Sequence, residues 1–355
     1  MRIFQSLATV ALSICLLATT QAVSAAGEDH PIRVDIQPEP VQAALEDQEP
    51  GEVLSPEDTL REVAPGVYVT YGVIGTIDEF NRGFNGNAGF VVTDEGVVVI
   101  DALGSPRLGK AWLETIRSVT DKPIEYLVLT HNHPDHSYGA VAFREETDAT
   151  VIAHPATEDY LRSNQFADSV AYREDLLEED FEGFEAVHPD ETVEPAFGEP
   201  LELEVGGEAF HVYNVGGHHS FGDLLIHMPD RQITWGSDLY FQNRTTYMLD
   251  GNLEDYFKAD ELAKGLETEL MIPGHGVAQE GPPFPMREKT VSYVTRLRDM
   301  MKDAVENMVP LSEAVNQAEE SFPEWEDTAL FEENHRKNAN FIYTQMEQKL
   351  LFGEE

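Results

Sequence analysis

The sequence predicts an α+β fold in which two β-sheets pack together and helices cover the outside. Short apolar runs typical of β-strands fall into two successive groups, separated by a helical stretch at residues 157–183. With 355 residues, of which 41% are hydrophobic, the chain has enough apolar material for a large buried core. Because sheets and helices bury their apolar faces against one another, two β-rich halves with helices indicate layered packing.

Residues 1–25 are predicted to be a signal peptide. Arg2 supplies a short positive region, an apolar run follows at residues 7–18, and Val23-Ser24-Ala25 is typical of a cleavage site. The run is too short to span a bilayer comfortably. We therefore expect export to a periplasm or secretion after cleavage near Ala25, with no stable membrane anchor. The single cysteine, Cys15, lies in this segment, so the mature chain has no thiol for a disulfide or a metal.

Residues 26–62 are rich in Glu, Asp, Pro and Ala and show little hydrophobic periodicity, which predicts an acidic, partly disordered arm. The whole sequence has 66 Asp and Glu against 23 Lys and Arg, a formal net charge of −43. Such an acid excess disfavours nucleic acid as a partner, because each phosphate contact needs a cation. It disfavours anionic membrane surfaces for the same reason.

A compact domain is predicted over residues 63–285. Its first half contains strands expected at residues 67–73, 89–93, 97–100, 126–130 and 150–154. Ser105 and Pro106 are typical of the N-cap and first position of a helix, here expected to end near Val119. The second half contains strands expected at residues 201–205, 210–215, 223–228, 232–235 and 270–272, with a helix at residues 255–265.

Residues 286–355 are predicted to form a C-terminal helical extension. One apolar stripe contains Val291, Val294, Leu297, Met300 and Met301, and a second lies between Phe331 and Leu351. Such stripes usually belong to a core. We expect these helices to cover a sheet or to contact a second copy of the chain in a homodimer.

The most informative segment follows the strand at residues 126–130 and contains three of the chain's 12 histidines: Thr130-His131-Asn132-His133-Pro134-Asp135-His136. Imidazole nitrogens and carboxylate oxygens are ligands that borderline divalent metals prefer. Four such groups within six residues do not easily reach one ion, whereas two neighbouring ions can use them all. The segment therefore predicts a metal site.

Three further loops offer metal ligands where predicted strands end. They contain Gly216-Gly217-His218-His219-Ser220-Phe221-Gly222-Asp223, Trp235-Gly236-Ser237-Asp238 and Pro273-Gly274-His275-Gly276. Glycine at such positions lets the backbone approach a metal centre without a Cβ clash. Together these loops supply one ligand each at strand ends, where functional sites are usually placed.

At these positions the sequence resembles the metallo-β-lactamase superfamily, from about residue 63 to residue 276. The matching residues are Asp101, His131, His133, Asp135, His136, His219, Asp238 and His275. The resemblance implies an αβ/βα four-layer sandwich with the site at the sheet edges. It favours His219 over His218, because Ser220, Gly222 and Asp223 complete the family pattern. It also implies that Asp101 orients the site loops without binding metal itself.

A narrower resemblance extends into the tail. Arg244-Thr245-Thr246-Tyr247, Asp250-Gly251-Asn252-Leu253 and the stretch from Phe331 through His335-Arg336-Lys337-Asn338 to Glu347 are similar to exported SoxH-type hydrolases. Those proteins are associated with sulfur oxidation or with quinoprotein systems.

The superfamily resemblance implies a hydrolase with two Zn²⁺ per chain and a small-molecule substrate. His131, His133 and His219 would hold the first ion, and Asp135, His136 and His275 the second, with Asp238 bridging both. Two ions lower the pKa of a shared water, which would attack an ester, thioester, lactone or amide carbonyl, including that of a β-lactam. Asp135 would act as the catalytic proton acceptor and shuttle.

Substrate contacts are expected from two segments. Residues 77–84 are predicted to form a mobile hairpin over the site, in which Phe80 and Phe84 either contact substrate or pack locally. Arg244 and Tyr247 follow Asp238 closely and are candidates to reach the pocket, but for Arg244 the many carboxylates of the chain favour a structural ion pair.

Two alternatives to the zinc hydrolase remain open. One Fe²⁺ held by His131, His133 and His219 would leave positions free for oxygen, as in the persulfide dioxygenases of the same superfamily. A non-catalytic binding module on the same fold is the second alternative. The lactamase subclass with a metal-binding cysteine is excluded, because Asp238 stands at that position.

Overall fold

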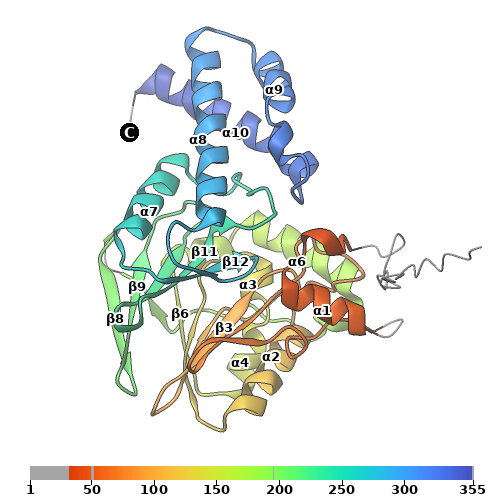
Figure 1. Ribbon diagram of the computed structural model, residues 1–355, viewed down its shortest axis with the longest axis vertical. Coiled ribbons are helices and arrows are strands. Elements are labelled where there is room, and N and C mark those ends of the chain that lie inside the picture. The colour runs from red at the N-terminus through yellow and green to blue at the C-terminus, as the bar shows by residue number, and fades with distance from the viewer. Residues whose placement is uncertain (1–31, 49–51, 195, 354–355) are drawn as a thin grey trace, which may run out of the picture.

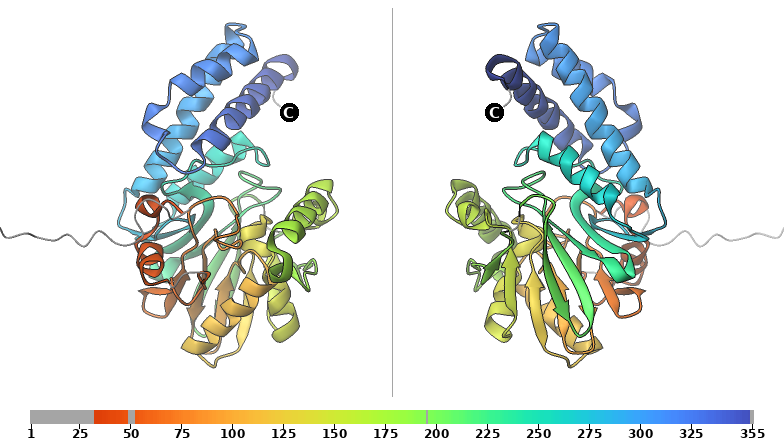
Figure 2. Two further views of the ribbon diagram at one scale, coloured as in Figure 1. Left: turned by 90° about the vertical axis from the view of Figure 1, so that its right-hand side faces the viewer. Right: turned by 90° about the vertical axis from the view of Figure 1, so that its left-hand side faces the viewer.

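Two β-sheets face each other, with helices outside them and a C-terminal helical bundle at one end (Figure 1, Figure 2). The computed structural model describes residues 32–48, 52–194 and 196–353. The predicted α+β fold of two packed sheets is confirmed. The main core contains buried side chains of both sheets, among them Phe90 and Val99 of the first sheet and Phe210 and Ile226 of the second.

The first sheet has seven strands among the described residues, and their spatial order follows the chain from β1 to β7. β3 to β4 is an antiparallel pair, whereas β4, β5 and β6 run parallel. All four residues of β4 are buried, which explains its unbroken run of Val and Ile. The strands are β1 (Arg61–Ala64), β2 (Val67–Thr70), β3 (Ala88–Val92), β4 (Val97–Ile100), β5 (Ile124–Val128), β6 (Thr150–Ala153) and β7 (Glu191–Thr192).

The second sheet has six strands in the described part of the chain, ordered β13-β12-β11-β10-β9-β8. β11 continues to Phe241, although its strand pattern predicts an end near Trp235, and every residue of it is buried. Parallel pairing with β12 carries the strand through Gly236-Ser237-Asp238, a sequence typical of a loop. The strands are β8 (Pro200–Val205), β9 (Glu208–Asn214), β10 (Leu224–Met228), β11 (Ile233–Phe241), β12 (Leu270–His275) and β13 (Gln279–Glu280).

Helix α2 begins where the sequence places its cap, whereas α7, expected from residue 255, begins two residues earlier at Leu253. The side chain of Ser105 accepts a hydrogen bond from the Leu108 amide, and Pro106 is the first residue of α2, which ends at Val119 as predicted. Asn252 caps α7 in the same way. The helices are α2 (Pro106–Val119), α3 (Pro134–Ser137), α4 (Ala140–Glu146), α5 (Thr157–Leu161), α6 (Asn164–Leu177) and α7 (Leu253–Gly265).

The tail forms three helices, α8 (Pro285–Glu306), α9 (Leu311–Glu320) and α10 (Phe331–Phe352), which rise from the second sheet (Figure 1). One buried cluster joins Leu297 of α8 and Ile342 of α10 to Leu239 of β11. The bundle therefore shares a core with the outer face of the second sheet. Contact with a second copy of the chain stays a prediction.

The expectation of a partly disordered arm at residues 26–62 is wrong for the part that the structure describes. A 3₁₀ turn, η1 (Val34–Ile36), precedes helix α1 (Glu39–Asp47). Val41 and Leu45, one helical turn apart, are 0% and 4% exposed and belong to the main core. Two apolar side chains at this spacing suffice to dock a short helix, and the acidic average composition hides them.

Two predictions for the N-terminus concern residues outside the part of the chain that the structure describes. They are the predicted signal peptide, residues 1–25, and the start of the acidic arm at residues 26–31. Within the part of the chain that is described, no helix combines the length and the apolar character needed to cross a membrane.

Candidate metal centre

Four of the predicted ligands come from the turn that follows β5. His131 directly follows Thr130, and His133 precedes Pro134, the first residue of the short helix α3. 

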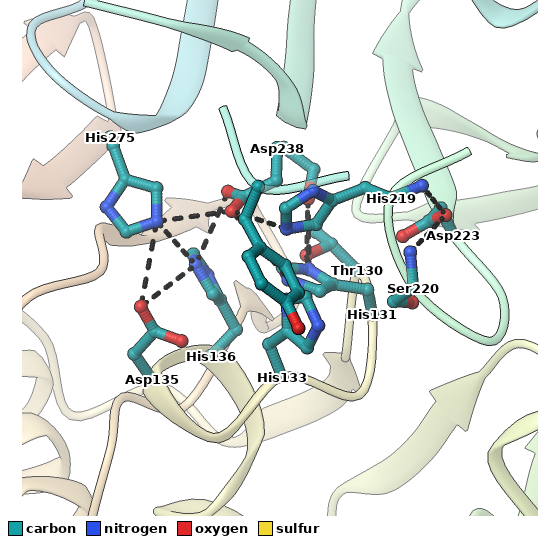
Figure 3. Close-up of polar contacts among 12 residues, drawn as sticks. Thr130, His131, His133, Asp135, His136, His219, Ser220, Asp223, Asp238 and His275 are labelled. Atoms are coloured by element: carbon teal, nitrogen blue, oxygen red, sulfur yellow. Dashed lines mark hydrogen bonds and ion pairs between the residues drawn. The ribbon is translucent and has the colours of Figure 1, made fainter. Parts of the chain in front are cut away.

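This helical turn places Asp135 and His136 on successive positions, where both side chains reach the edge between the two sheets (Figure 3). His131 and His136 are almost completely buried. The first sheet therefore delivers a preformed group of donors.

The other three predicted ligands come from the second sheet. His219 lies in the loop between β9 and β10, Asp238 lies within β11, and His275 is the last residue of β12. Figure 3 shows these side chains converging on those of the first sheet. The centre thus lies between the sheets, and each sheet supplies a share of it.

The seven side chains form two groups. His131, His133, His219 and Asp238 form the first, and Asp135, His136 and His275 form the second; within each group the donor atoms lie within 4.8 Å of one another. Asp238 contacts both groups, because its Oδ2 lies 3.1 Å from His219 Nε2 and 3.2 Å from His275 Nε2. The structure therefore brings together all seven residues that the sequence singles out, with Asp238 between the groups.

Each histidine of the β5 turn has one ring nitrogen occupied by an outer partner. Nδ1 of His131 lies 3.0 Å from Thr130 Oγ1, while its buried Nε2 has no hydrogen-bond partner. Nδ1 of His136 lies 3.0 Å from Asp101 Oδ2, and Nε2 of His133 lies 3.2 Å from Asp250 Oδ2. One nitrogen held from outside and one turned inward is the arrangement of metal-binding histidines.

Asp101 connects β4 to the β5 turn. It accepts hydrogen bonds from the Thr130 amide at 2.8 Å and the Thr130 hydroxyl at 2.9 Å, in addition to its contact with His136. Asp101 adopts a positive φ of 64°, which few non-glycine residues do. It therefore lies where it can orient the turn, behind the inward-facing donors.

At Asp135, Asp238 and His136, the charges within the centre outweigh the effect of burial on the pKa. Burial disfavours the ionised carboxylates, yet the nearby histidines hold the pKa of Asp135 and of Asp238 below the usual range of an aspartate. Burial alone would lower the pKa of His136, but Asp238, Asp135 and Asp101 raise it to about 9. Burial and the neighbouring His136 hold the pKa of His131 well below its usual value. Ionised carboxylates beside neutral His131 suit a bound cation.

The loop after β9 distinguishes His219 from His218. Asp223 accepts hydrogen bonds from the backbone amides of His219 at 2.8 Å and Ser220 at 3.1 Å. The loop is therefore folded back on itself so that His219 faces Asp238, whereas His218 faces Asp223 at 3.3 Å.

Gly274 leaves the room that Asp238 occupies. A Cβ atom at this position would lie 2.0 Å from Asp238 Oδ1 and 3.1 Å from a ring carbon of His136. Only glycine fits at this strand end, beside a carboxylate oxygen that has no hydrogen-bond partner of its own. Buried ligand atoms without hydrogen-bond partners, such as Asp238 Oδ1, around a space too small for a side chain are typical of a metal-binding site.

The expected hairpin over the site differs from what the structure contains. Phe84 is completely buried in the main core, so its predicted substrate contact is wrong, whereas Phe80 is 45% exposed. Arg82 ties this segment to Asp180 at 2.8 Å, and residues 77–84 contain no paired strand. Asn85 is the residue after this segment that reaches the centre, donating to Asp135 Oδ2 at 2.8 Å.

Arg244 and Tyr247 both lie at the centre. Arg244 Nη1 is 2.8 Å from His275 Nδ1, and among the described residues it forms no ion pair with a carboxylate. The Tyr247 ring lies 6.2 Å from that of His133, and burial together with Asp250 raises the pKa of Tyr247 to about 12. The structural ion pair that the sequence favours for Arg244 is therefore not found in the described part of the chain, and Arg244 contacts His275 instead.

Sequence reasoning did not assign a role to Asp250, Asn85 or Ser237. Asp250 lies 117 residues from its partner His133, and no motif spacing links the two. Ser237 Oγ lies 3.2 Å from His131 Nδ1. The one available signal is the polar segment Asp250-Gly251-Asn252, which directly precedes a helix.

Comparisons with known proteins agree with this geometry. The family model described as "Metallo-beta-lactamase superfamily" matches residues 81–275. Metallo-beta-lactamase IND-1 of Chryseobacterium indologenes is 25% identical over 214 residues, 59% of this chain and 77% of the relative. The 2,4-dinitroanisole O-demethylase subunit alpha of Nocardioides sp. (strain JS1661) is 23% identical over 51% of this chain, which spans only half of that relative.

Solved structures show the same fold. A metallo-beta-lactamase from Pontibacter korlensis has a TM-score of 0.51 at 19% identity, over 66% of this chain and 98% of its own. The sec-alkylsulfatase Pisa1 from Pseudomonas sp. has a TM-score of 0.60 at 16% identity, over 83% of this chain and 50% of its own. Since the family model spans more than half of the sequence, the chain belongs to the metallo-beta-lactamase superfamily, as a metal-dependent hydrolase.

Proposed function

We propose that the protein is a dinuclear zinc hydrolase that cleaves an ester, thioester, lactone or amide carbonyl, β-lactams included. The observation that supports this most directly is the second group of donors. Asp135, His136 and His275 lie together, and Asp238 contacts this group and the first one. A centre for a single ion would not need both groups.

The donor chemistry favours zinc. His131, His133 and His219 would hold one ion, Asp135, His136 and His275 the other, and Asp238 both. Imidazole and carboxylate donors without a thiolate are typical of catalytic zinc sites. Bound zinc would supply Lewis acidity and would lower the pKa of a bound water towards neutrality.

The chain's own residues would handle the proton. Asp135 stays ionised at neutral pH, because histidines hold its pKa below the usual range, and Asn85 fixes its Oδ2 through a 2.8 Å hydrogen bond. A fixed, ionised carboxylate can accept a proton from the attacking water and pass it to the leaving group. Arg244 and Tyr247 would border the substrate.

Metal content is the first test. Elemental analysis of mature protein, purified without added metal or chelator, should give about two zinc ions per chain. About one iron per chain would instead support the mononuclear dioxygenase and lead to persulfide substrates. Neither metal, with no uptake on titration, would leave the non-catalytic binding module.

Variants test the catalytic role. Asp135→Asn and His131→Ala should each lower turnover of a chromogenic ester, a lactone or a chromogenic cephalosporin by about 100-fold or more. His188→Ala is the matched control, because His188 is an exposed histidine paired with Glu158, outside both donor groups. Circular dichroism should show the native fold in all three. Full turnover in both site variants would contradict the hydrolase.

We also propose that the protein is exported. A full-length gene product expressed in a bacterial host should lose residues 1–25, so that the mature chain begins at Ala26. Intact-mass analysis of the periplasmic or secreted fraction measures this directly. Accumulation of an uncleaved chain in the cytoplasm would refute it.

A further inference from the structure

One loop contacts three of the stretches that carry the proposed ligands. We call residues 244–252, which join β11 to α7, the site loop. Its first residue, Arg244, touches His275, and Asp250 near its end touches His133. Gly251 packs against the backbone of His218, where a Cβ would come within 2.3 Å of the carbonyl oxygen. The position of this loop therefore affects both donor groups.

Helix α10 holds the site loop from behind. Asn338, 0% exposed, donates from Nδ2 to the Thr246 carbonyl at 2.8 Å and accepts at Oδ1 from the Met248 amide at 3.2 Å. Asn334, one turn earlier, donates to the Thr245 carbonyl at 3.1 Å. Two of the three stretches that carry the narrower resemblance, residues 244–247 and 331–347, therefore meet in the fold.

The site loop begins with a single β-bridge between Arg244 and Ala329, and beyond it Asn338 supplies hydrogen bonds to the loop backbone. Buried backbone groups need hydrogen-bond partners, and one amide side chain supplies both a donor and an acceptor to the loop. Asn338 Nδ2 also donates to Tyr293 Oη at 3.2 Å, and Tyr293 Oη lies within hydrogen-bond distance of His335 Nδ1, at 3.0 Å. A buried polar chain thus links the loop to the core of the helical bundle.

We propose that Asn338 is a positioning residue of the active site, through which the C-terminal bundle sets the site loop. By fixing the loop backbone, Asn338 keeps Asp250 against His133 and keeps Tyr247 and Arg244 at the centre. The inference rests on the proposed metal-binding role of His133. It makes the bundle part of the catalytic apparatus as well as a cover for the second sheet.

A merely structural role for Asn338 makes a different prediction, and Tyr293→Phe separates the two. That variant removes the hydroxyl shared by Asn338 and His335 in the bundle core and leaves both bonds from Asn338 to the loop. Asn338→Ala removes the loop bonds themselves. Asn340→Ala, an exposed asparagine on the same helix, is the matched control.

Hydrogen exchange of the full chain tests whether the loop is held. In metal-free protein, Asn338→Ala should speed exchange of amides 244–252 by about tenfold, because the Met248 amide loses its acceptor. Tyr293→Phe and Asn340→Ala should leave exchange of this loop unchanged. Unchanged loop exchange in Asn338→Ala would overturn the proposal.

Zinc affinity, measured by competition with a chromogenic chelator, tests whether the loop matters to the centre. Loss of an outer partner of a metal-binding histidine typically weakens affinity by about 10–100-fold. Asp250→Asn should fall in that range, and Asn338→Ala should weaken zinc binding by about tenfold. With zinc saturating, kcat/KM of Asn338→Ala should also fall on any substrate that the wild type turns over.

The outcomes separate this inference from the proposed function. If wild-type protein takes up two zinc ions and Asn338→Ala matches it in affinity and kcat/KM, the positioning role is refuted and the zinc hydrolase stands. If Tyr293→Phe weakens zinc binding as much as Asn338→Ala does, the role is only structural. If the wild type binds no zinc, the proposed function fails and the inference fails with it.

Discussion

His136 shows how a single side chain in this centre responds to the loss of a metal. Three carboxylates surround its buried ring and raise its pKa to about 9, so the metal-free protein carries a proton there at neutral pH. Zinc must displace that proton to bind Nε2. Metal uptake near pH 7.5 should therefore release a proton from His136, and this release should vanish above about pH 9.

The same group predicts how the stability of the metal-free protein changes with pH. Its folded pKa of about 9 exceeds the ordinary 6.5, so its contribution is complete below pH 6.5 and disappears as pH rises through 9. Urea unfolding of metal-free protein should show a fall on the order of 3 kcal/mol across that window. In His136→Gln the fall should be absent; an identical fall in the variant would refute the assignment.

A prediction at Gly274 concerns steric crowding, because a single added methyl group at this position would clash with Asp238. Gly274→Ala puts a Cβ 2.0 Å from Asp238 Oδ1 and forces that carboxylate away from both donor groups. Zinc affinity should fall by about 100-fold or more, as for loss of a ligand. Gly265→Ala is the control, because a Cβ there meets nothing within 4 Å. Retained affinity in Gly274→Ala would show that Asp238 is not needed.

At this scale, the sequence predicts donors far better than it predicts their partners. The sequence identifies the seven ligand residues because four of them lie in one motif and the other three lie in glycine-containing segments at the ends of predicted strands. Asp250 and Asn85 are not visible, because each meets its partner across a long separation in the chain, and contact of that kind is fixed only by folding. Phe84 misled for a related reason, since an apolar side chain beside a site suits the core equally well.

At the scale of elements, α1 is the clearest departure from expectation. The acidic composition of residues 26–62 conceals a helix whose Val41 is completely buried. Gln37 fixes the preceding turn, because its side chain bonds both backbone groups of Ile74, at 2.6 and 3.0 Å. Disorder is inferred from averages over many residues, whereas docking depends on a few.

Val41→Ala measures what the docking of α1 contributes. Removing two buried methyl groups should lower the free energy of unfolding by about 1–2 kcal/mol, through lost burial and the cavity that remains. Glu46→Ala, an exposed position on the same helix, should change it by less than about 0.5 kcal/mol. Chemical denaturation of the full chain gives both values. Equal effects would show that α1 is not docked in solution.

Strand ends follow the same logic as α1. β4 and α2 have the bounds that apolar run and cap predict, since all of their signals are local. β11 runs six residues past its expected end, because pairing with β12 outweighs the loop character of its glycine and serine. This extension places Asp238 on a strand, where its side chain is held more firmly than on a loop.

At the scale of the whole molecule, the donors are divided between the sheets. His131, His133, Asp135 and His136 follow β5 of the first sheet, and the remaining three belong to the second. Bound zinc would therefore hold the two halves together and stabilise only the docked state.

Removing the metal should lower thermal stability. A ligand present at 1,000 times its Kd adds about 4 kcal/mol to the folded state, which raises Tm by several degrees in a protein of this size. Calorimetry of zinc-loaded and chelator-treated protein measures the difference. His188→Ala should match the wild type, and His131→Ala should lose most of the gain. Equal Tm values with and without zinc would contradict the division of ligands.

The split of the donors between two sheets also sets an order of events during assembly. A first half that has folded alone contains four ligand residues but lacks His219, Asp238 and His275, so it can bind an ion only weakly. Tight metal binding requires the second sheet to form and pack against the first. Zinc uptake should therefore follow sheet formation during folding. Rapid-mixing measurements should show zinc binding after the strands have formed.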